Sequence, residues 1–217
     1  MFLKRKFIEP CQSLARIICY IYIMMKSSTH SAAILAGGSN LRFDGHMKPL
    51  ARFRGRAILD RQLEVLEPFF DEILLITNTP DLFSPYSSVR ILTDRLPGYG
   101  PLSGIHAALS KASGSNILVV AGDMPFINME TIQEQLRLAG ENPQKAIVPQ
   151  TGRQVEPLHA IYPVTALPSL QQHLQSAHEL SVRKWIQKIP VYYWKRKDSN
   201  PFININTPEE LRKYEKG

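Results

Sequence analysis

The chain has 217 residues, of which 44% are hydrophobic and 21% charged, and its formal net charge is +7. These values exclude an intrinsically disordered chain, and the length favours one domain with a substantial core. Residues 1–26 contain five Lys or Arg and one Glu, so more than half of the net charge lies there. The weak excess in the rest of the chain suits small anionic ligands better than a nucleic-acid groove, and we expect no nucleic-acid partner.

Residues 1–26 are predicted to be an N-terminal extension, and residues 27–217 to form the domain. Lys4-Arg5-Lys6 and the apolar run over 17–23 are similar to the start of a signal peptide. The run is too short to span a bilayer, and no convincing cleavage site follows it. We interpret residues 1–24 as the product of an upstream start, with an amphipathic extension as the second interpretation and an export signal as the third.

Both cysteines, Cys11 and Cys19, lie in this extension. Residues 27–217 therefore cannot form a disulfide, a cysteine-based zinc site or a thiol nucleophile. This composition agrees with a cytoplasmic location, and we expect no membrane attachment.

Apolar runs alternate with helical patterns along the rest of the chain. Strands are predicted over 32–36, 73–77, 89–93, 116–121, 146–149, 159–162 and 191–194. Helices are predicted over 57–70, 105–112, 129–138, 164–175, 182–189 and 208–215, with Asn128 as an N-cap. Residues 78–81 are typical of a turn or helix start, and the Pro and Gly residues of 95–104 indicate a loop. This alternation predicts an α/β domain with a mostly parallel sheet between layers of helices.

The apolar run over 32–36 ends abruptly in Gly37 and Gly38, and Arg42 and Lys48 follow. Glycines at the end of a strand expose backbone N–H groups at close range, and two cations nearby suit a polyphosphate. The glycine spacing fits neither a Rossmann fingerprint nor a P-loop. A plain turn with solvated cations remains the alternative interpretation of this segment.

Two further strand ends carry carboxylates, at Asp94 and Asp123. In a parallel sheet all three strand ends can meet at one edge, where such sheets bind ligands. Asp123 follows a buried strand, and a carboxylate beside a phosphate site is a natural Mg²⁺ ligand. The alternative is that Asp123 only caps the following turn.

The chain lacks a histidine pair with metal-ligand spacing, a nucleophile elbow and a serine-triad pattern. A reaction without a protein nucleophile is therefore favoured. Attack of an ionised phosphate on a nucleotide α-phosphate is such a reaction, because positioning and charge neutralisation do most of the work.

Several motifs follow one another along the chain: Leu35-Ala36-Gly37-Gly38, Arg42, Lys48, the segment 97–105 (PGYGPLSGI), Asp123-Met124-Pro125-Phe126 and the segment 202–211 (FININTPEEL). Taken in order, these motifs resemble those of the molybdenum cofactor guanylyltransferases. The resemblance runs from about Ser31 to the C-terminus. It implies a single three-layer Rossmannoid domain of the GT-A-like nucleotidyltransferase type, which transfers GMP from GTP to molybdopterin and releases pyrophosphate.

The resemblance also implies roles for individual residues. Leu35, Ala36, Gly37 and Gly38 would contact guanine and phosphates, and Lys48 would neutralise the triphosphate. Asn78 and Asp94 would bind the nucleoside, and Asp123 would hold Mg²⁺, with Mn²⁺ as an alternative. Asn204 and Asn206 would lie near the metal or the pterin, although both are also suited to capping the helix that follows. Arg42, Lys48 and Asp123 are the catalytic candidates, and molybdenum-insertion proteins or client molybdoenzymes are candidate partners.

The chain departs from the family pattern at Asn40, Phe43, Asp44 and Met47, and Asp44 adds an anion to the phosphate loop. A non-catalytic protein that binds a nucleotide or pterin and delivers it to a molybdoenzyme is therefore one alternative. A cytidylyltransferase of the same fold is another. Its relatives usually carry Ala-Ala-Gly at residues 36–38 and Asp-Gln-Pro at 123–125, so this chain favours guanine.

Overall fold

The computed structural model describes residues 30–37, 47–94, 96, 98–176 and 180–215. The predicted N-terminal extension and the departures at Asn40, Phe43 and Asp44 lie outside these residues. Among the described helices, none is both long and apolar enough to cross a membrane.

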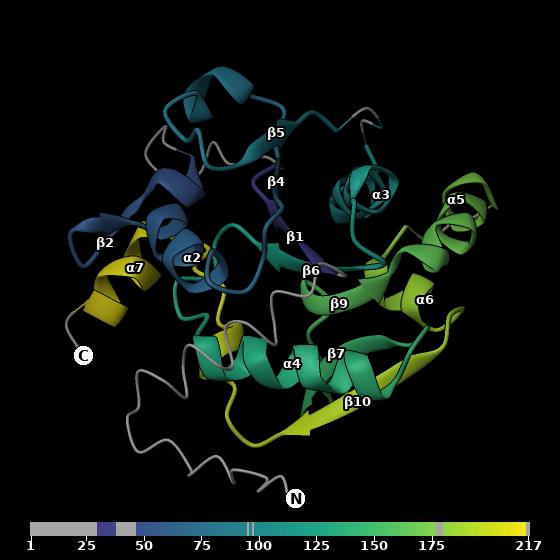
Figure 1. Ribbon diagram of the computed structural model, residues 1–217. Coiled ribbons are helices and arrows are strands. Elements are labelled where there is room, and N and C mark those ends of the chain that lie inside the picture. The colour runs from purple at the N-terminus through teal and green to yellow at the C-terminus, as the bar shows by residue number, and fades with distance from the viewer. Residues whose placement is uncertain (1–29, 38–46, 95, 97, 177–179, 216–217) are drawn as a thin grey trace, which may run out of the picture.

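A mixed eight-stranded sheet runs through the centre of the molecule (Figure 1). Its strand order is β5-β4-β1-β6-β9-β7-β10, and β8 pairs with β7. Strands β9 and β8 are antiparallel to their neighbours, and the other strands share one direction. The strands are β1 (His30–Leu35), β4 (Ile73–Ile76), β5 (Arg90–Leu92), β6 (Asn116–Ala121), β7 (Ala146–Thr151), β8 (Gln154–Val155), β9 (His159–Pro163) and β10 (Val191–Arg196).

Helices cover both faces of this sheet, which confirms the predicted three-layer α/β class. One face packs against α2 (Ile58–Leu66) and α4 (Met129–Glu141). The other face packs against α3 (Pro101–Lys111), α5 (Leu167–Ser176) and α6 (Val182–Ile186). The short 3-10 turns are η2 (Lys48–Leu50), η3 (Pro80–Phe83), η4 (Val164–Ala166) and η5 (Asn200–Phe202).

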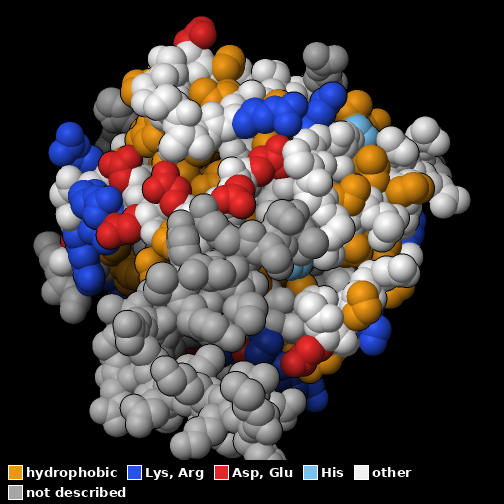
Figure 2. Space-filling view, viewed as in Figure 1, with side chains coloured by type: hydrophobic (Ala, Val, Ile, Leu, Met, Phe, Trp, Pro, Cys, Tyr) orange, Lys and Arg blue, Asp and Glu red, His pale blue; other side chains and the backbone are white. Residues whose placement is uncertain are grey.

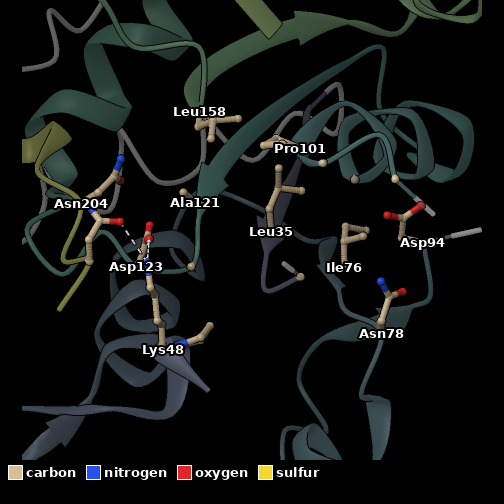
Figure 3. A pocket seen from close by; sticks show the side chains of 17 residues that line it. Leu35, Lys48, Ile76, Asn78, Asp94, Pro101, Ala121, Asp123, Leu158 and Asn204 are labelled. Carbon is tan, nitrogen blue, oxygen red and sulfur yellow. Dashed lines mark hydrogen bonds and ion pairs between the residues drawn. The ribbon is translucent and has the colours of Figure 1, made fainter. Parts of the chain in front are cut away.

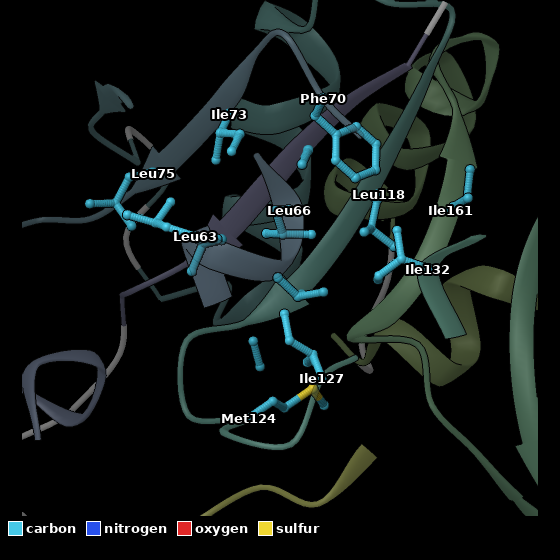
Figure 4. Packing of buried hydrophobic residues seen from close by; sticks show 14 of the residues in the cluster. Leu63, Leu66, Phe70, Ile73, Leu75, Leu118, Met124, Ile127, Ile132 and Ile161 are labelled. Atoms are coloured by element: carbon cyan, nitrogen blue, oxygen red, sulfur yellow. The ribbon is translucent and has the colours of Figure 1, made fainter. Parts of the chain in front are cut away.

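The side chains of β1 alternate between the two cores, as the two-residue period of a strand requires. Ala32 and Ile34 join the cluster under α2 and α4, where Leu63 and Ile132 pack (Figure 4). Ala33 joins the cluster under α3. Both faces of β1 are buried, and its pairing with β4 and β6 places its last residue, Leu35, opposite Ile76 and Ala121.

The outer sides of α2 and α4 carry charged side chains. Arg137 pairs with Glu134 and Glu141 on α4, and Arg56 pairs with Glu64 of α2 at 2.7 Å. Figure 2 shows acidic and basic side chains interspersed over this face of the molecule. Exposed pairs of this kind contribute little to stability, so the fold depends on the two apolar clusters.

A small hairpin and the last helix form a third cluster beside the sheet. The hairpin joins β2 (Arg52–Phe53) to β3 (Arg56–Ala57), and the last helix is α7 (Pro208–Glu215). Phe126 packs edge-on against both Phe53 and Tyr214, with ring centroids 5.2 and 5.3 Å apart. These contacts bring the C-terminal end of the chain close to the segment that follows β6.

Most predicted elements are present, with ends that shift by a few residues. Asn128 caps α4 as predicted, since its side chain accepts a hydrogen bond from the Thr131 N–H at 2.9 Å. The loop predicted over 95–104 is wrong in its last part, because α3 already begins at Pro101. Proline suits the first helical position, and Gly104 packs closely under Leu35. The hairpin of β2 and β3 and the short β8 have no counterpart among the predicted elements.

His159 is a fully buried histidine in β9, packed edge-on against Phe202 with ring centroids 4.9 Å apart. Burial lowers the pKa of His159 from 6.5 to about 4, because the charged ring would lose its hydration. The native protein therefore holds this side chain neutral through the mildly acidic range.

We expect His159 to make the free energy of unfolding depend on pH. Between pH 6.5 and 4 the unfolded chain binds a proton at His159 that the folded chain does not, so stability falls as pH falls. From pH 7 to pH 5 the loss from this group is about 2 kcal/mol. Urea unfolding at both pH values should show a correspondingly smaller loss for His159→Leu. An equal loss in wild type and variant would contradict this assignment.

Candidate active site

A cavity of about 540 Å³ opens at the carboxyl ends of β1, β4, β5 and β6 (Figure 3). This is the sheet edge at which α/β proteins of this kind bind ligands. Backbone and side chains from both halves of the chain form its wall. The lining residues are Leu35, Gly37, Lys48, Pro49, Ile76, Asn78, Asp94, Gly98, Gly100, Pro101, Gly104, Ala121, Gly122, Asp123, Leu158, Asn204 and Asn206.

Most of the predicted site residues meet in this cavity. They are Leu35, Gly37, Lys48, Asn78, Asp94, Asp123, Asn204 and Asn206. Ala36 does not line the cavity, because it is buried and its N–H donates to the Ile76 carbonyl at 2.8 Å. Gly38 and Arg42 lie outside the described residues, so their predicted roles stay predictions.

Lys48 and Asp123 form an ion pair on one side of the cavity. The Lys48 ammonium donates to Asp123 Oδ2 and to Asn206 Oδ1, each at 3.0 Å. The side chains of Lys48 and Asp123 are only 15% and 18% exposed, so the pair is largely removed from water. Charges in such a place interact more strongly than on the surface and are suited to an ionic ligand.

Gly122 allows this pair to form. A Cβ atom at Gly122 would lie 2.8 Å from Pro49 Cγ and 3.0 Å from the Leu35 carbonyl oxygen. Only glycine lets η2 pack this tightly against the ends of β1 and β6. Because Pro49 follows Lys48 directly, this close packing places the lysine beside Asp123.

Asp94 lies across the cavity from this ion pair, near Asn78 (Figure 3). The Leu96 N–H donates to Asp94 Oδ1 at 2.8 Å, and the Ser103 hydroxyl donates to Oδ2. The carboxylate is therefore held in one orientation by its own loop and by α3. The sequence analysis did not assign this role to Ser103, and the signal that could have found it is its place in the motif over 97–105.

Gly98 and Gly100 shape the loop between Asp94 and α3. Their φ angles are +89° and +54°, a region that residues with a side chain rarely adopt. The loop can therefore turn sharply into Pro101 at the cavity wall. The N-terminal end of α3, with its partial positive charge, lies at the same wall.

Asn204 lies on the same side as Asp123 in Figure 3. Its Oδ1 atom is buried and has no hydrogen-bond partner among the described residues. The neighbouring Ile205 N–H donates to the Asp123 carbonyl at 2.9 Å, which ties the two segments together. A buried oxygen without a donor beside a carboxylate fits a cation ligand.

The alternative role of Asn204 and Asn206, as caps of the last helix, is wrong. Thr207 caps α7, since its Oγ1 atom accepts from the Glu210 N–H at 3.1 Å. The Asn206 side chain instead accepts from Lys48. Local sequence suggested a cap at several positions, and the tertiary contact with Lys48 decided between them.

Leu158 is a lining residue that sequence reasoning missed. It comes just before β9, the antiparallel strand beside β6, and it supplies an apolar side chain to the cavity wall near Ala121 (Figure 3). Its position between Pro157 and a strand gave no sign of this role.

The site thus combines Gly37 at the end of β1 with the ion pair of Lys48 and Asp123, at the sheet edge of a three-layer domain. A family model described as the MobA-like NTP transferase domain matches residues 32–192. The chain belongs to this family, and it is a nucleotidyltransferase.

Individual relatives carry the name of the family that the sequence motifs resemble. The chain is 32% identical over 196 residues to a "Probable molybdenum cofactor guanylyltransferase" of Peptoclostridium acidaminophilum, covering 85% of this chain and 87% of the relative. It is 29% identical over 191 residues to the molybdenum cofactor guanylyltransferase of Syntrophotalea carbinolica, covering 85% and 90%. The crystal structure of molybdopterin-guanine dinucleotide biosynthesis protein A from Archaeoglobus fulgidus matches with a TM-score of 0.73 and 26% identity, covering 86% and 97%. The predicted resemblance is confirmed.

Replacing Gly122 with alanine should displace Lys48 and weaken nucleotide binding. The added Cβ meets Pro49 and the β1 backbone, so Lys48 must move away from Asp123, and overpacking of this kind costs about 1–3 kcal/mol. We expect the affinity for a nucleoside triphosphate, measured by calorimetry, to fall by about tenfold or more.

Gly140→Ala is the matched control, because a Cβ there meets nothing within 4 Å and the residue lies in α4. This variant should bind nucleotide normally and unfold at an equal or higher temperature. Normal binding by Gly122→Ala would mean that close packing at this point does not set the position of Lys48.

Proposed function

We propose that the protein transfers GMP from GTP to molybdopterin, forming the guanine dinucleotide form of the molybdenum cofactor and releasing pyrophosphate. The observation that carries this proposal is the placement of Lys48 and Asp123 beside Asn204 at one side of the cavity, with Asn78 and Asp94 at the other. A nucleoside fits at the Asp94 side, and its phosphates would then reach the ion pair.

The reaction joins the two substrates directly. An oxygen of the molybdopterin phosphate attacks the α-phosphorus of GTP, and the bond from this phosphorus to the oxygen that bridges to the β-phosphate breaks. Pyrophosphate takes the electron pair of that bond. The attacking phosphate is already ionised near neutral pH, so no protein nucleophile is required, and the protein positions the substrates and neutralises charge.

The lining residues have roles in binding or charge neutralisation that follow from their chemistry. The Lys48 ammonium neutralises the triphosphate, and the backbone of Leu35 and Gly37 contacts the nucleotide at the end of β1. Asn78 and the fixed carboxylate of Asp94 bind the nucleoside. We assign the pterin substrate to the side of the cavity that the apolar Leu158 and the amide of Asn204 line.

A divalent metal, Mg²⁺ or alternatively Mn²⁺, fits the donors at Asp123. The described residues contain no group of three or more His, Cys, Asp or Glu side chains that could hold a metal by themselves. Asp123 and the unpartnered Oδ1 of Asn204 would hold the ion together with phosphate oxygens, which is the usual way in which Mg²⁺ is bound. When bound, it would stabilise the charge that develops on the phosphates.

The proposal is tested by measuring pyrophosphate release with GTP, Mg²⁺ and molybdopterin. We expect release that requires all three, and we expect GTP to bind more tightly than CTP or ATP in a competition titration. Equal or better binding of CTP would overturn the guanine assignment and favour the alternative that the protein is a cytidylyltransferase. Binding of GTP without any pyrophosphate release would favour a non-catalytic carrier of nucleotide or pterin.

Asp123→Asn should abolish most of the activity while the protein still folds. The amide keeps the shape of the carboxylate and can still accept from Lys48, but it lacks the charge that holds the metal. Loss of one such electrostatic contact costs roughly 3 kcal/mol, or about 100-fold in rate. Turnover at saturating GTP and limiting Mg²⁺ measures this effect. Asp81→Asn, on exposed η3, should leave the rate unchanged. Turnover of Asp123→Asn near the wild-type rate would instead make Asp94 or Asp44 the candidate metal ligand.

A further inference from the structure

Glu210 lies in the first turn of α7, and its two hydrogen bonds lead to the cavity. The Glu210 N–H donates to Thr207 Oγ1 at 3.1 Å, and the Glu210 carboxylate accepts from the Asn206 N–H at 2.7 Å. Reciprocal bonds of this kind are typical of a helix capping box. In an ordinary capping box the carboxylate binds the N–H of the N-cap residue, whereas here it binds that of Asn206, one residue earlier.

This displacement of one residue connects the helix to the ion pair. The side chain of Asn206, whose backbone Glu210 holds, accepts a hydrogen bond from the Lys48 ammonium at 3.0 Å. Lys48 in turn binds Asp123 at 3.0 Å. A continuous series of hydrogen bonds therefore joins Glu210, Asn206, Lys48 and Asp123.

We propose that Glu210 is a positioning residue for the phosphate-binding lysine and acts on it through Asn206. This inference rests on the proposed function, because it assumes that Lys48 binds the nucleotide phosphates. Glu210 itself does not line the cavity. Glu210 affects the ligand only indirectly, because it fixes the position of Asn206, whose Oδ1 atom is the second acceptor of the Lys48 ammonium.

The Lys48 side chain needs such a support because a lysine has a flexible four-carbon stem. Asp123 alone would leave the ammonium free to rotate about one contact. The segment 203–206 has no regular secondary structure, and buried Ile205 fixes its middle. The bond from Glu210 fixes the next residue, so the Asn206 amide is aimed at Lys48.

The docking of α7 does not depend on Glu210. Leu211 and Tyr214 pack against the cluster that contains Phe53 and Ile205. At the other end of the helix, Arg54 donates from its guanidinium to the Tyr214 carbonyl at 3.2 Å and from its backbone to Glu215 at 3.0 Å. Removal of the Glu210 carboxylate therefore leaves the helix in place and loosens only the segment before it.

The first experiment compares Glu210→Ala with Glu210→Gln and with Glu209→Ala. Glu209 is the neighbouring carboxylate, and its side chain pairs with Arg212 within α7. Loss of one hydrogen bond predicts a GTP dissociation constant about threefold to tenfold higher for Glu210→Ala. Glu210→Gln should restore most of the affinity, since its amide oxygen can still accept from Asn206. Glu209→Ala should bind like the wild type.

The second experiment is a double-mutant cycle with Asn206→Ala, with the GTP dissociation constant as its readout. If Glu210 acts through Asn206, Glu210→Ala has no further effect once the Asn206 side chain is absent. Additive effects would overturn the inference, as would an equal loss of affinity in Glu209→Ala, because the role of Glu210 would then be general stability of α7.

Lys48→Met separates failure of this inference from failure of the proposed function. Unchanged GTP binding by Lys48→Met would overturn the role of Lys48 and with it the inference. Weak binding by Lys48→Met together with wild-type binding by Glu210→Ala would overturn the positioning role alone.

Discussion

The ion pair between Lys48 and Asp123 joins segments that are far apart in the sequence, and the rest of the site is arranged around it. Lys48 comes from the turn that follows β1, Asp123 from the end of β6, and Asn206 from the segment before the last helix. Because β1 and β6 are neighbours in the parallel part of the sheet, their carboxyl ends lie side by side. Gly122 then allows η2 to pack onto both ends, which removes the charged pair from most of the surrounding water.

The two sides of the cavity owe their different chemistry to the sheet topology. The parallel strands β4 and β5 end beside the residues Asn78 and Asp94, whose polar groups suit a nucleoside. On the other side, antiparallel β9 pairs with β6 in the reverse direction. The chain enters β9 at the same edge at which β6 ends, so Leu158 contributes an apolar contact there. One sheet edge therefore presents a polar side and an apolar side beside one ion pair.

The C-terminal segment shows how one sequence motif can serve two purposes. Thr207 and Glu210 begin α7, as a capping motif should, yet the residue that the carboxylate holds is the one that contacts Lys48. The alternatives for Asn206, a cap or a site residue, could not be separated by local chemistry because both need a polar side chain at the same place. The position of Lys48 decides which of the two roles the Asn206 side chain takes.

The buried strands, the layered α/β class, the N-cap at Asn128 and the three strand ends that line the cavity could be predicted from the amino-acid sequence. These follow from apolar runs and local hydrogen bonds, which involve residues close together in the chain. The contact of Ser103 with Asp94 and the contacts of Lys48 with Asp123 and Asn206 follow only from the tertiary structure. Those contacts join residues 9, 75 and 158 positions apart. No local pattern specifies them, because the distance between such residues is fixed only when the whole sheet and its two helical layers have packed.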